Sequence, residues 1–386
     1  MDKTREKACL CALNRIFGFE PKAGLALIGH FGSASAIFSL DGNDLDALLG
    51  PYSKFRKEIS ERNVDEAVME LERLEKKGIR FTGWSEEGYP ERLKDCEDAP
   101  VGLYIRSSST DDELWKGHRT LSAVGTRDIT PYGREWCTRI IRSLAETEEK
   151  PAIISGLAIG TDICAHRTAI DAGLPTIAVM ATGPDSIYPV RHTDFAEQLA
   201  STPGCALVTD YPPGTAPLAV HFLRRNRIIA GLGEATLLIE SKIKGGGMMT
   251  ANLAFSYGRE VYAVPGRIDD SCSQGCNHLI RSKVAEAVTG TAELIKSLGM
   301  NATALRKPLQ CKDRIASVYG GRMPEDKVEE LTGMLLQIKR NRGMTIEELA
   351  TACGMDYSHA SQMTGLLEAD GLITVDLLQR CCINIR

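Results

Sequence analysis

The spacing of apolar and polar positions divides the chain into regions of different periodicity. Residues 1–78 contain short apolar stretches at helical spacing, separated by glycines, which predicts a small helical domain. From 79 to 299, short apolar or β-branched runs alternate with helical stretches. Residues 300–322 are basic and irregular, which predicts a linker. Residues 323–386 predict three helices and a two-stranded wing, the pattern of a winged helix.

The middle region predicts a parallel sheet. Its strand candidates are LSAV, AIIS, TIAVM, ALVTD, ATLLIE and EVYAV. Strands that alternate with helices are joined by right-handed crossovers, so their carboxyl ends lie on one edge of the sheet. Open α/β sheets bind ligands at that edge. The sequence therefore predicts an α/β, Rossmann-like domain with its function in the loops that directly follow the strands.

Composition limits the classes of function. The 386 residues are 43% apolar, and no segment has the pattern of a signal peptide or of a membrane-spanning helix. We therefore expect a cytoplasmic protein with no membrane partner. The 12 cysteines are scattered without zinc-site spacing, so we expect core thiols and neither a metal nor a cofactor. A net charge of −5 means that nucleic-acid binding would depend on a local basic patch.

The first two predicted strand ends combine glycines with a cation or with a helix start. Arg127, in VGTRDITPYG, offers a planar guanidinium that suits a phosphate. The turn in SGLAIGTDICAH precedes a helix whose free amides favour an anion, and we interpret Asp162 there as a structural cap. The candidate ligand contacts in these loops are Gly125, Thr126, Arg127, Ser155, Gly156 and Gly160.

The third and fourth strand ends add more arginines. Arg191 follows Tyr188 in GPDSIYPVRHTDF, a mixture of charge and aromatic surface that single strands use, although Tyr188 also fits a packed turn. The segment VHFLRRNRIIAGLG crowds three arginines beside an apolar helix. These cations repel one another unless a strongly negative group lies between them, so they favour a phosphate partner over salt bridges. They are Arg224, Arg225 and Arg227.

The last two strand ends repeat the combination of glycine and cation. SKIKGGGMMTANLAF has the composition of a phosphate-binding loop but lacks the order of a Walker motif, and the chain has no GxGxxG after a strand. In GREVYAVPGRIDD a further arginine follows glycine, and we expect Asn277 to cap the next helix. The candidate contacts here are Lys242, Gly246, Thr250 and Arg267.

Taken in order, VGTRxxTxYG, SGLAxGxDxxAH, GxxxIYPxR, DYPPGTxP, RNRIIAGL, GREVYAVPG and GxNxLI resemble the DprA/Smf family from about residue 80 to 290. The helical start with FGSASAIF is similar to that family's SAM-like (helix-hairpin-helix) domain, and the tail resembles the winged helix of some members. The resemblance implies a homodimer that binds single-stranded DNA without strict sequence preference, helps load RecA recombinase during natural transformation, and catalyses no reaction. It places Arg127, the 155–160 turn, Arg191, Arg225 and Arg227 at the DNA.

The chain departs from the family pattern in three places. It has GTR where the family has GSR, GTD where it has GID, and GGGMMTA where it has SGSxxTA. Gly245 and Gly247 therefore offer only backbone donors.

Two other functions are compatible with parts of the sequence. GGGMMTANLA is superficially similar to the PGGxGTxxE loop of LOG-type nucleotide phosphoribohydrolases, but Asn252 and Leu253 stand near the place of the glutamate. A transcriptional regulator would use the winged helix on duplex DNA. Its recognition helix, YSHASQMTGLLEAD, has two acids and no Lys or Arg, so we expect a protein contact or self-association instead.

Overall fold

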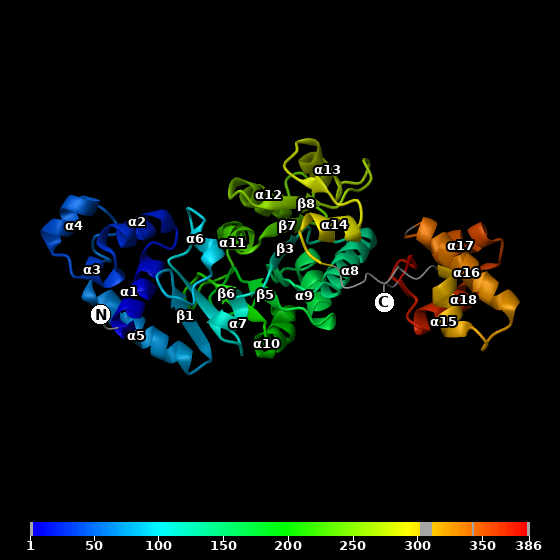
Figure 1. Ribbon diagram of the computed structural model, residues 1–386, viewed down its shortest axis with the longest axis horizontal. Helices are drawn as coiled ribbons and strands as arrows, with labels where there is room; N and C mark the ends of the chain where they lie inside the picture. The colour runs from blue at the N-terminus through cyan, green and yellow to red at the C-terminus, as the bar shows by residue number, and fades with distance from the viewer. Residues whose placement is uncertain (1–2, 302–310, 342, 384–386) are drawn as a thin grey trace. The chain divides into compact units, whose positions relative to one another are not determined.

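The computed structural model describes residues 3–301, 311–341 and 343–383. These residues form two compact units, one of 1–128 with 149–289 and one of 129–148 with 290–386. Figure 1 shows the helices and strands of each unit.

The first unit begins with five helices. Ser33 caps the third of them by accepting a hydrogen bond from the amide of Ala36 at 3.2 Å, and Asp41 caps the fourth through the amides of Asn43 and Asp44 at 2.8 and 2.9 Å. The helices are α1 (Lys3–Ile16), α2 (Pro21–Phe31), α3 (Ala34–Phe38), α4 (Gly42–Leu49) and α5 (Glu61–Glu75). Their apolar faces share one hydrophobic core with strands β1 (Ile79–Gly83) and β2 (Gly102–Arg106). The helices before residue 79 and the sheet after it are therefore packed together.

A nine-stranded sheet follows, in the order β1-β2-β6-β5-β4-β3-β7-β8-β9. All neighbours from β6 to β9 are parallel, whereas β1 pairs with β2 and β2 with β6 in antiparallel fashion. The strands are β1 (Ile79–Gly83), β2 (Gly102–Arg106), β3 (Thr120–Val124), β4 (Ala152–Ser155), β5 (Thr176–Val179), β6 (Ala206–Thr209), β7 (Ala235–Leu238), β8 (Glu260–Ala263) and β9 (Glu286–Ala287).

Helices cover the sheet on both sides (Figure 1). Both α9 (Thr161–Asp171) and α11 (Ala219–Leu232) contact β3, β4 and β5, which requires opposite faces of those strands. The parallel strands are buried along most of their length, and they read as apolar runs because both of their faces are covered. The other helices of this unit are α6 (Glu91–Lys94), α7 (Asp111–Trp115), η1 (Val190–His192), α10 (Thr193–Ser201), α12 (Gly246–Ser256) and α13 (Gln274–Arg281).

The second unit is mainly helical. Its elements are α8 (Pro131–Ala145), α14 (Thr291–Ser297), α15 (Cys311–Tyr319), α16 (Glu325–Arg340), α17 (Ile346–Cys353), α18 (Tyr357–Ala369), and the antiparallel pair β10 (Ile373–Val375) and β11 (Cys381–Ile383). The order of α16, α17, α18, β10 and β11 is the order predicted for a winged helix, and the assignment to that fold class stays a prediction.

Two sequence-based predictions need correction. All six predicted strands form, but the sheet also has β1 and β2, which were not predicted and which lie antiparallel at its edge. The linker prediction for 300–322 is wrong for 311–319, which form α15 and pack Ile315 and Tyr319 into the core of the second unit. The basic residues around this segment hid its helical apolar spacing. Positions 302–310 lie outside the described residues.

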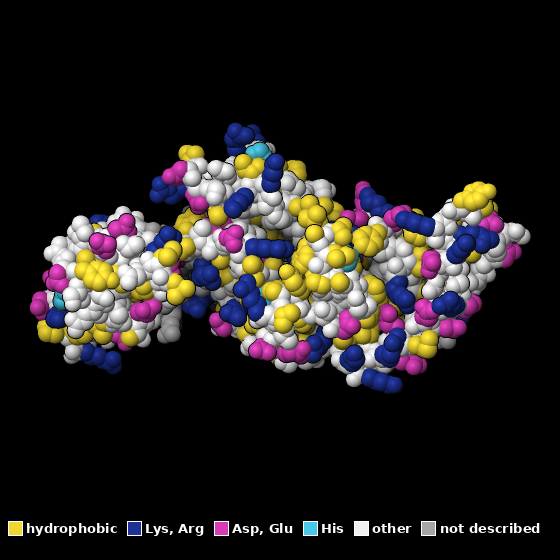
Figure 2. Space-filling view, turned by 180° about the vertical axis from the view of Figure 1, so that it is seen from behind, with side chains coloured by type: hydrophobic (Ala, Val, Ile, Leu, Met, Phe, Trp, Pro, Cys, Tyr) yellow, Lys and Arg dark blue, Asp and Glu magenta, His cyan; other side chains and the backbone are white. Residues whose placement is uncertain are grey.

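All 12 cysteines are free thiols, and ten of them are buried, as expected for core residues. In the part of the chain that the structure describes, no helix is both long and apolar enough to cross a membrane. Lysine and arginine side chains are interspersed with aspartate and glutamate over the face shown in Figure 2.

Candidate nucleic-acid interface

The order of the parallel strands along the chain reverses between β3 and β7. Strand β3 pairs with β4 on one side and with β7 on the other, so the crossovers leave the carboxyl ends of β3 and β7 in opposite directions. Such a switch point opens a crevice in an α/β sheet. The Ile239 amide donates to the Val124 carbonyl at 3.0 Å, which holds the two loops together at the edge.

Glycines allow the backbone segments at this switch point to approach closely. A Cβ on Gly125 would lie 2.4 Å from Oγ1 of Thr161, and one on Gly247 would lie 3.1 Å from Cα of Gly125. Gly160 has φ +82°, and a Cβ there would lie 2.3 Å from the Thr126 carbonyl oxygen. That oxygen accepts hydrogen bonds from the Thr161 amide at 3.0 Å and its hydroxyl at 3.1 Å. Larger residues would push these loops apart.

Arg225 lies beneath the loop after β4. It is 4% exposed, and its guanidinium donates to the carbonyls of Gly156 and Val179 at 2.6 and 2.5 Å. A Cβ on Gly156 would lie 2.0 Å from this guanidinium. Gly156 therefore makes room for an arginine of the protein itself, and both residues hold the strand-end loops in position.

Asp162 is the charge that faces Arg225. Its carboxylate accepts a hydrogen bond from the Ala158 amide at 3.3 Å, in the loop before α9. The cap predicted at Asp162 is wrong, because Gly160 is the N-cap of α9 and no side chain of the described residues caps this helix. Burial raises the pKa of Asp162, and the positive charge of Arg225 opposes that rise. Burial likewise lowers the pKa of Arg225, and Asp162 opposes that shift. Each charge therefore offsets part of the other's cost of burial beneath the edge.

Arg227 and Arg224 are also engaged with the protein. Arg227 is 6% exposed, pairs with the Asp210 carboxylate and donates to the Asp98 carbonyl. Arg224 lies 3.6 Å from the same carboxylate and donates to the Gly18 carbonyl. Thus the negative group that separates these arginines belongs to the protein. The phosphate contacts predicted for Arg225 and Arg227 stay predictions, and the burial of both guanidiniums counts against them.

Other predicted residues remain at the surface. Arg127, Arg191, Lys242 and Arg267 are exposed, as are Lys244 and the backbone of Gly246. Arg267 forms a bidentate pair with Asp269 at 2.9 and 3.1 Å, which reduces the charge it offers to a ligand. The remaining four cations lie in the loops that follow β3, β5 and β7, at the carboxyl edge of the sheet.

Arg127 belongs to a row that the sequence did not reveal. Its guanidinium lies 5.3 Å from the ring centroid of Phe222, and that ring lies 5.4 Å from the Tyr188 ring in an edge-on arrangement. Tyr188 is 44% exposed and Phe222 is half-buried, so the packed turn expected for Tyr188 describes only part of its surroundings. We call Arg127, Phe222 and Tyr188 the strand-end row. The signal for it was Phe222, two residues before the first arginine of the cluster in VHFLRRNR.

Three polar residues singled out in the sequence have structural roles or are buried. Ser155 is fully buried and donates to the Ala123 carbonyl at 2.6 Å, and Thr250 is 2% exposed within α12. The cap predicted at Asn277 is wrong, because α13 begins at Gln274. Asn277 instead holds the loop after β8 by two hydrogen bonds to the backbone of Gly266, at 3.0 and 3.2 Å.

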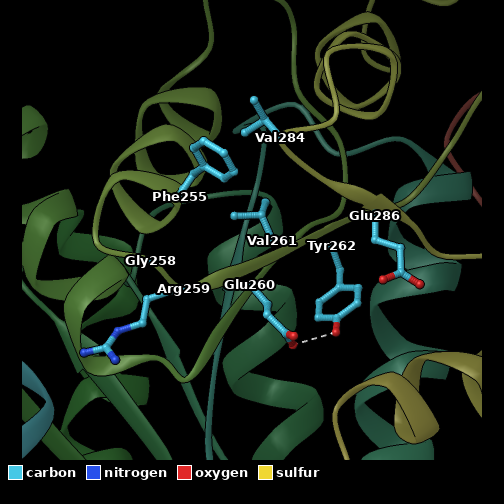
Figure 3. Close-up of a pocket in the computed structure, with 8 residues that line it drawn as sticks. All are labelled: Phe255, Gly258, Arg259, Glu260, Val261, Tyr262, Val284 and Glu286. Carbon is cyan, nitrogen blue, oxygen red and sulfur yellow. Dashed lines mark hydrogen bonds between the residues drawn. The ribbon is translucent and has the colours of Figure 1, made fainter.

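A hollow of about 430 Å³ lies at the opposite edge of the sheet. Figure 3 shows that its walls come from the end of α12, from β8 and from the segment leading into β9. Its lining includes Phe255 and Val284, and the Tyr262 hydroxyl donates to the Glu260 carboxylate at 2.8 Å. Because the hollow lies at the amino end of β8, it is separate from the strand-end loops.

Comparison with known proteins shows a family over the region of the sheet. Residues 80–299, more than half of the chain, match the family model described as DNA recombination-mediator protein A. A DNA processing protein DprA of Mycobacterium tuberculosis is 34% identical over 249 residues, which cover 62% of this chain and 62% of that protein. This chain thus spans less than two thirds of that relative's length.

Two solved structures share the fold. DNA processing protein A of Streptococcus pneumoniae superposes with a TM-score of 0.57 and 30% identity, over 66% of this chain and 85% of that one. The structure of DNA processing protein A from Helicobacter pylori, which describes a single-stranded DNA binding mode, superposes with a TM-score of 0.50 and 26% identity, over 56% and 95% of the two chains. From the family model that matches more than half of the chain, the shared fold and these relatives, we conclude that this chain belongs to the DNA recombination-mediator protein A family.

Proposed function

We propose that the protein binds single-stranded DNA at the carboxyl edge of its sheet, without strict sequence preference. The observation that carries this proposal is the strand-end row, in which a guanidinium and two aromatic rings lie side by side on the edge. Bases stack on such rings whatever their sequence, and exposed cations attract the backbone phosphates. The single-stranded DNA binding described for the Helicobacter pylori relative supports the same assignment.

The contacts divide by role. Arg127, Arg191 and Lys242 approach phosphates directly, with the exposed Gly246 backbone at the uncapped start of α12 as a further donor. Arg225 acts from beneath as a positioning residue, because it fixes the loop after β4. Arg227 fixes the start of α11 to Asp210 in the same way.

We further propose that the protein binds and delivers DNA and does not catalyse a reaction on it. Asn252 stands near the position where LOG-type phosphoribohydrolases have a glutamate. Its side-chain amide donates a hydrogen bond to the Met248 carbonyl at 2.9 Å. Family membership supports a cytoplasmic homodimer that acts in DNA uptake and recombination and helps load RecA onto incoming DNA.

Fluorescence anisotropy tests the binding proposal. A labelled oligothymidine and a duplex of equal length are titrated between about 50 and 200 mM salt, with wild type, Arg127→Ala and the control Arg73→Ala. We expect tight, salt-dependent binding of the single strand, a loss of about tenfold in Arg127→Ala, and no change in the control, which lies on α5. Equal, weak binding of both DNAs that Arg127→Ala leaves unchanged would refute the proposal.

A further inference from the structure

A second exposed aromatic ring lies beside the first turn of α11. Phe19, between α1 and α2, is 59% exposed. The Arg224 guanidinium lies 4.5 Å from its ring centroid, and the His221 ring lies 5.9 Å from it. The exposed face of Phe19 is apolar surface that a ligand can cover.

The protein holds this ring firmly in place. Arg224 is itself held by the Gly18 carbonyl and by Asp210, and its guanidinium also lies 5.8 Å from the Tyr211 ring. His221 is 7% exposed, stacks 4.5 Å from Tyr211 and is bound through Nδ1 to the Ala216 carbonyl at 2.9 Å. A ring that is already ordered loses little conformational entropy when a ligand stacks on it.

The first turn of α11 connects this ring to the strand-end row. His221, which contacts Phe19, is followed in the chain by Phe222, which contacts Arg127 and Tyr188. Between the two rings the turn itself is exposed and apolar, with Leu218, Val220 and Leu223 at 54%, 48% and 48%. One helical turn thus carries an aromatic contact on each side.

We infer that Phe19 is a second base-stacking subsite, on which single-stranded DNA continues beyond the strand-end row. Here Arg224 serves as the cation behind the ring, and the apolar turn offers surface to the bases between the two subsites. Glu20, the acid next to Phe19, is paired with Lys54 at 2.5 Å, which weakens its repulsion of phosphates. This inference rests on the proposed function and extends its site to the helical region.

A length series of oligothymidines, from about 4 to about 24 nucleotides, tests the subsite by anisotropy. Wild type is compared with Phe19→Ala, Phe19→Trp and the control Tyr52→Ala, which removes another exposed aromatic ring, 99% exposed, from the same helical region. We expect Phe19→Ala to lose about tenfold in affinity for the long oligomers and nothing for the shortest that bind. Phe19→Trp should keep the affinity and show quenched indole fluorescence on binding, even if Phe19→Ala folds poorly.

Several outcomes would overturn the inference. Unchanged affinity of Phe19→Ala at every length, with no quenching in Phe19→Trp, would exclude DNA stacking there and leave a protein contact as the role of Phe19. An equal loss at all lengths would place the effect on the strand-end row itself. If wild type bound no oligomer, the proposed function would fail and the subsite with it, whereas normal binding of short oligomers keeps the two failures distinct.

Discussion

The Arg127 guanidinium lies 5.3 Å from the ring centroid of Phe222, so the first loop of the parallel sheet and the first turn of α11 meet at one point. Replacing Phe222 with alanine removes a stacking surface and also frees Arg127 to move. We expect about tenfold weaker single-strand binding, with most of the affinity retained in Phe222→Trp. Phe255→Ala, which removes an exposed ring from the hollow at the amino end of β8, is the control, and anisotropy is the measurement. Equal losses in both variants would contradict a stacking role.

The buried and exposed arginines should separate stability from binding. Arg227→Ala leaves the buried Asp210 carboxylate without its main partner, which should cost about 3 kcal/mol in the free energy of unfolding. Arg127→Ala should change that free energy by less than about 0.5 kcal/mol, because the side chain is exposed. Urea unfolding of both variants measures the difference. If Arg227→Ala kept full stability and lost only DNA affinity, Arg227 would be a direct contact after all.

The glycines of the switch point differ in what they tolerate. Gly160→Ala would place a Cβ 2.3 Å from a carbonyl oxygen at a φ of +82°, so we expect at least about 2 kcal/mol of destabilisation and a disturbed binding edge. Gly246→Ala meets nothing within 4 Å and should leave the melting temperature nearly unchanged. Thermal melting compares the two. A Gly160→Ala protein as stable as wild type would show that the loop has another conformation.

His166 should make the fold sensitive to acid. Burial and the nearby charges of Arg225 and His192 lower its pKa to about 3, while an unfolded histidine titrates near about 6.5. Below about pH 6.5 the unfolded chain binds a proton at this histidine, whereas the folded chain does not. The free energy of unfolding therefore decreases as the pH is lowered, by about 2 kcal/mol at about pH 5. Thr176 donates its hydroxyl proton to the Ile153 carbonyl, so Nδ1 of His166 donates to Thr176, at 2.7 Å.

Asparagine can supply the same donor without titrating. The melting temperature of His166→Asn should therefore depend less on pH between about 7 and 5 than that of wild type. The exposed His118→Asn is the control. An unchanged pH dependence in His166→Asn would mean that His166 is not kept neutral in the folded protein.

The residues after Leu309, which include α15–α18, β10 and β11, should contribute little to single-strand affinity. Helix α18 carries no Lys or Arg, and the tip between β10 and β11 exposes Leu377 and Leu378 with a single cation, Arg380. Removal of the residues after Leu309 should leave the affinity within a few-fold of wild type. A drop of tenfold or more in anisotropy would assign DNA binding to these residues.

The sequence predicted the sheet well because each parallel strand is a short apolar run between glycine-rich loops. It did not predict the antiparallel strands β1 and β2, because they lie outside the alternation of strands and helices that marks the parallel sheet. It missed α15 because basic residues obscure Ile315 and Tyr319. Within the site, the sequence alone identifies the glycines and the cations. Whether an arginine points outward, as Arg127 does, or inward to a carbonyl, as Arg225 does, depends on tertiary packing.

The location of the DNA can be tested with a single-stranded oligomer that carries photoreactive thymidines, followed by mass spectrometry of the crosslinked peptides. If DNA lies on the carboxyl edge of the sheet, crosslinks will fall on the peptides that contain Tyr188 and Phe222, and Arg127→Ala will reduce them. Crosslinks confined to α18 and the β10–β11 tip, or to the hollow beside Phe255, would contradict this account.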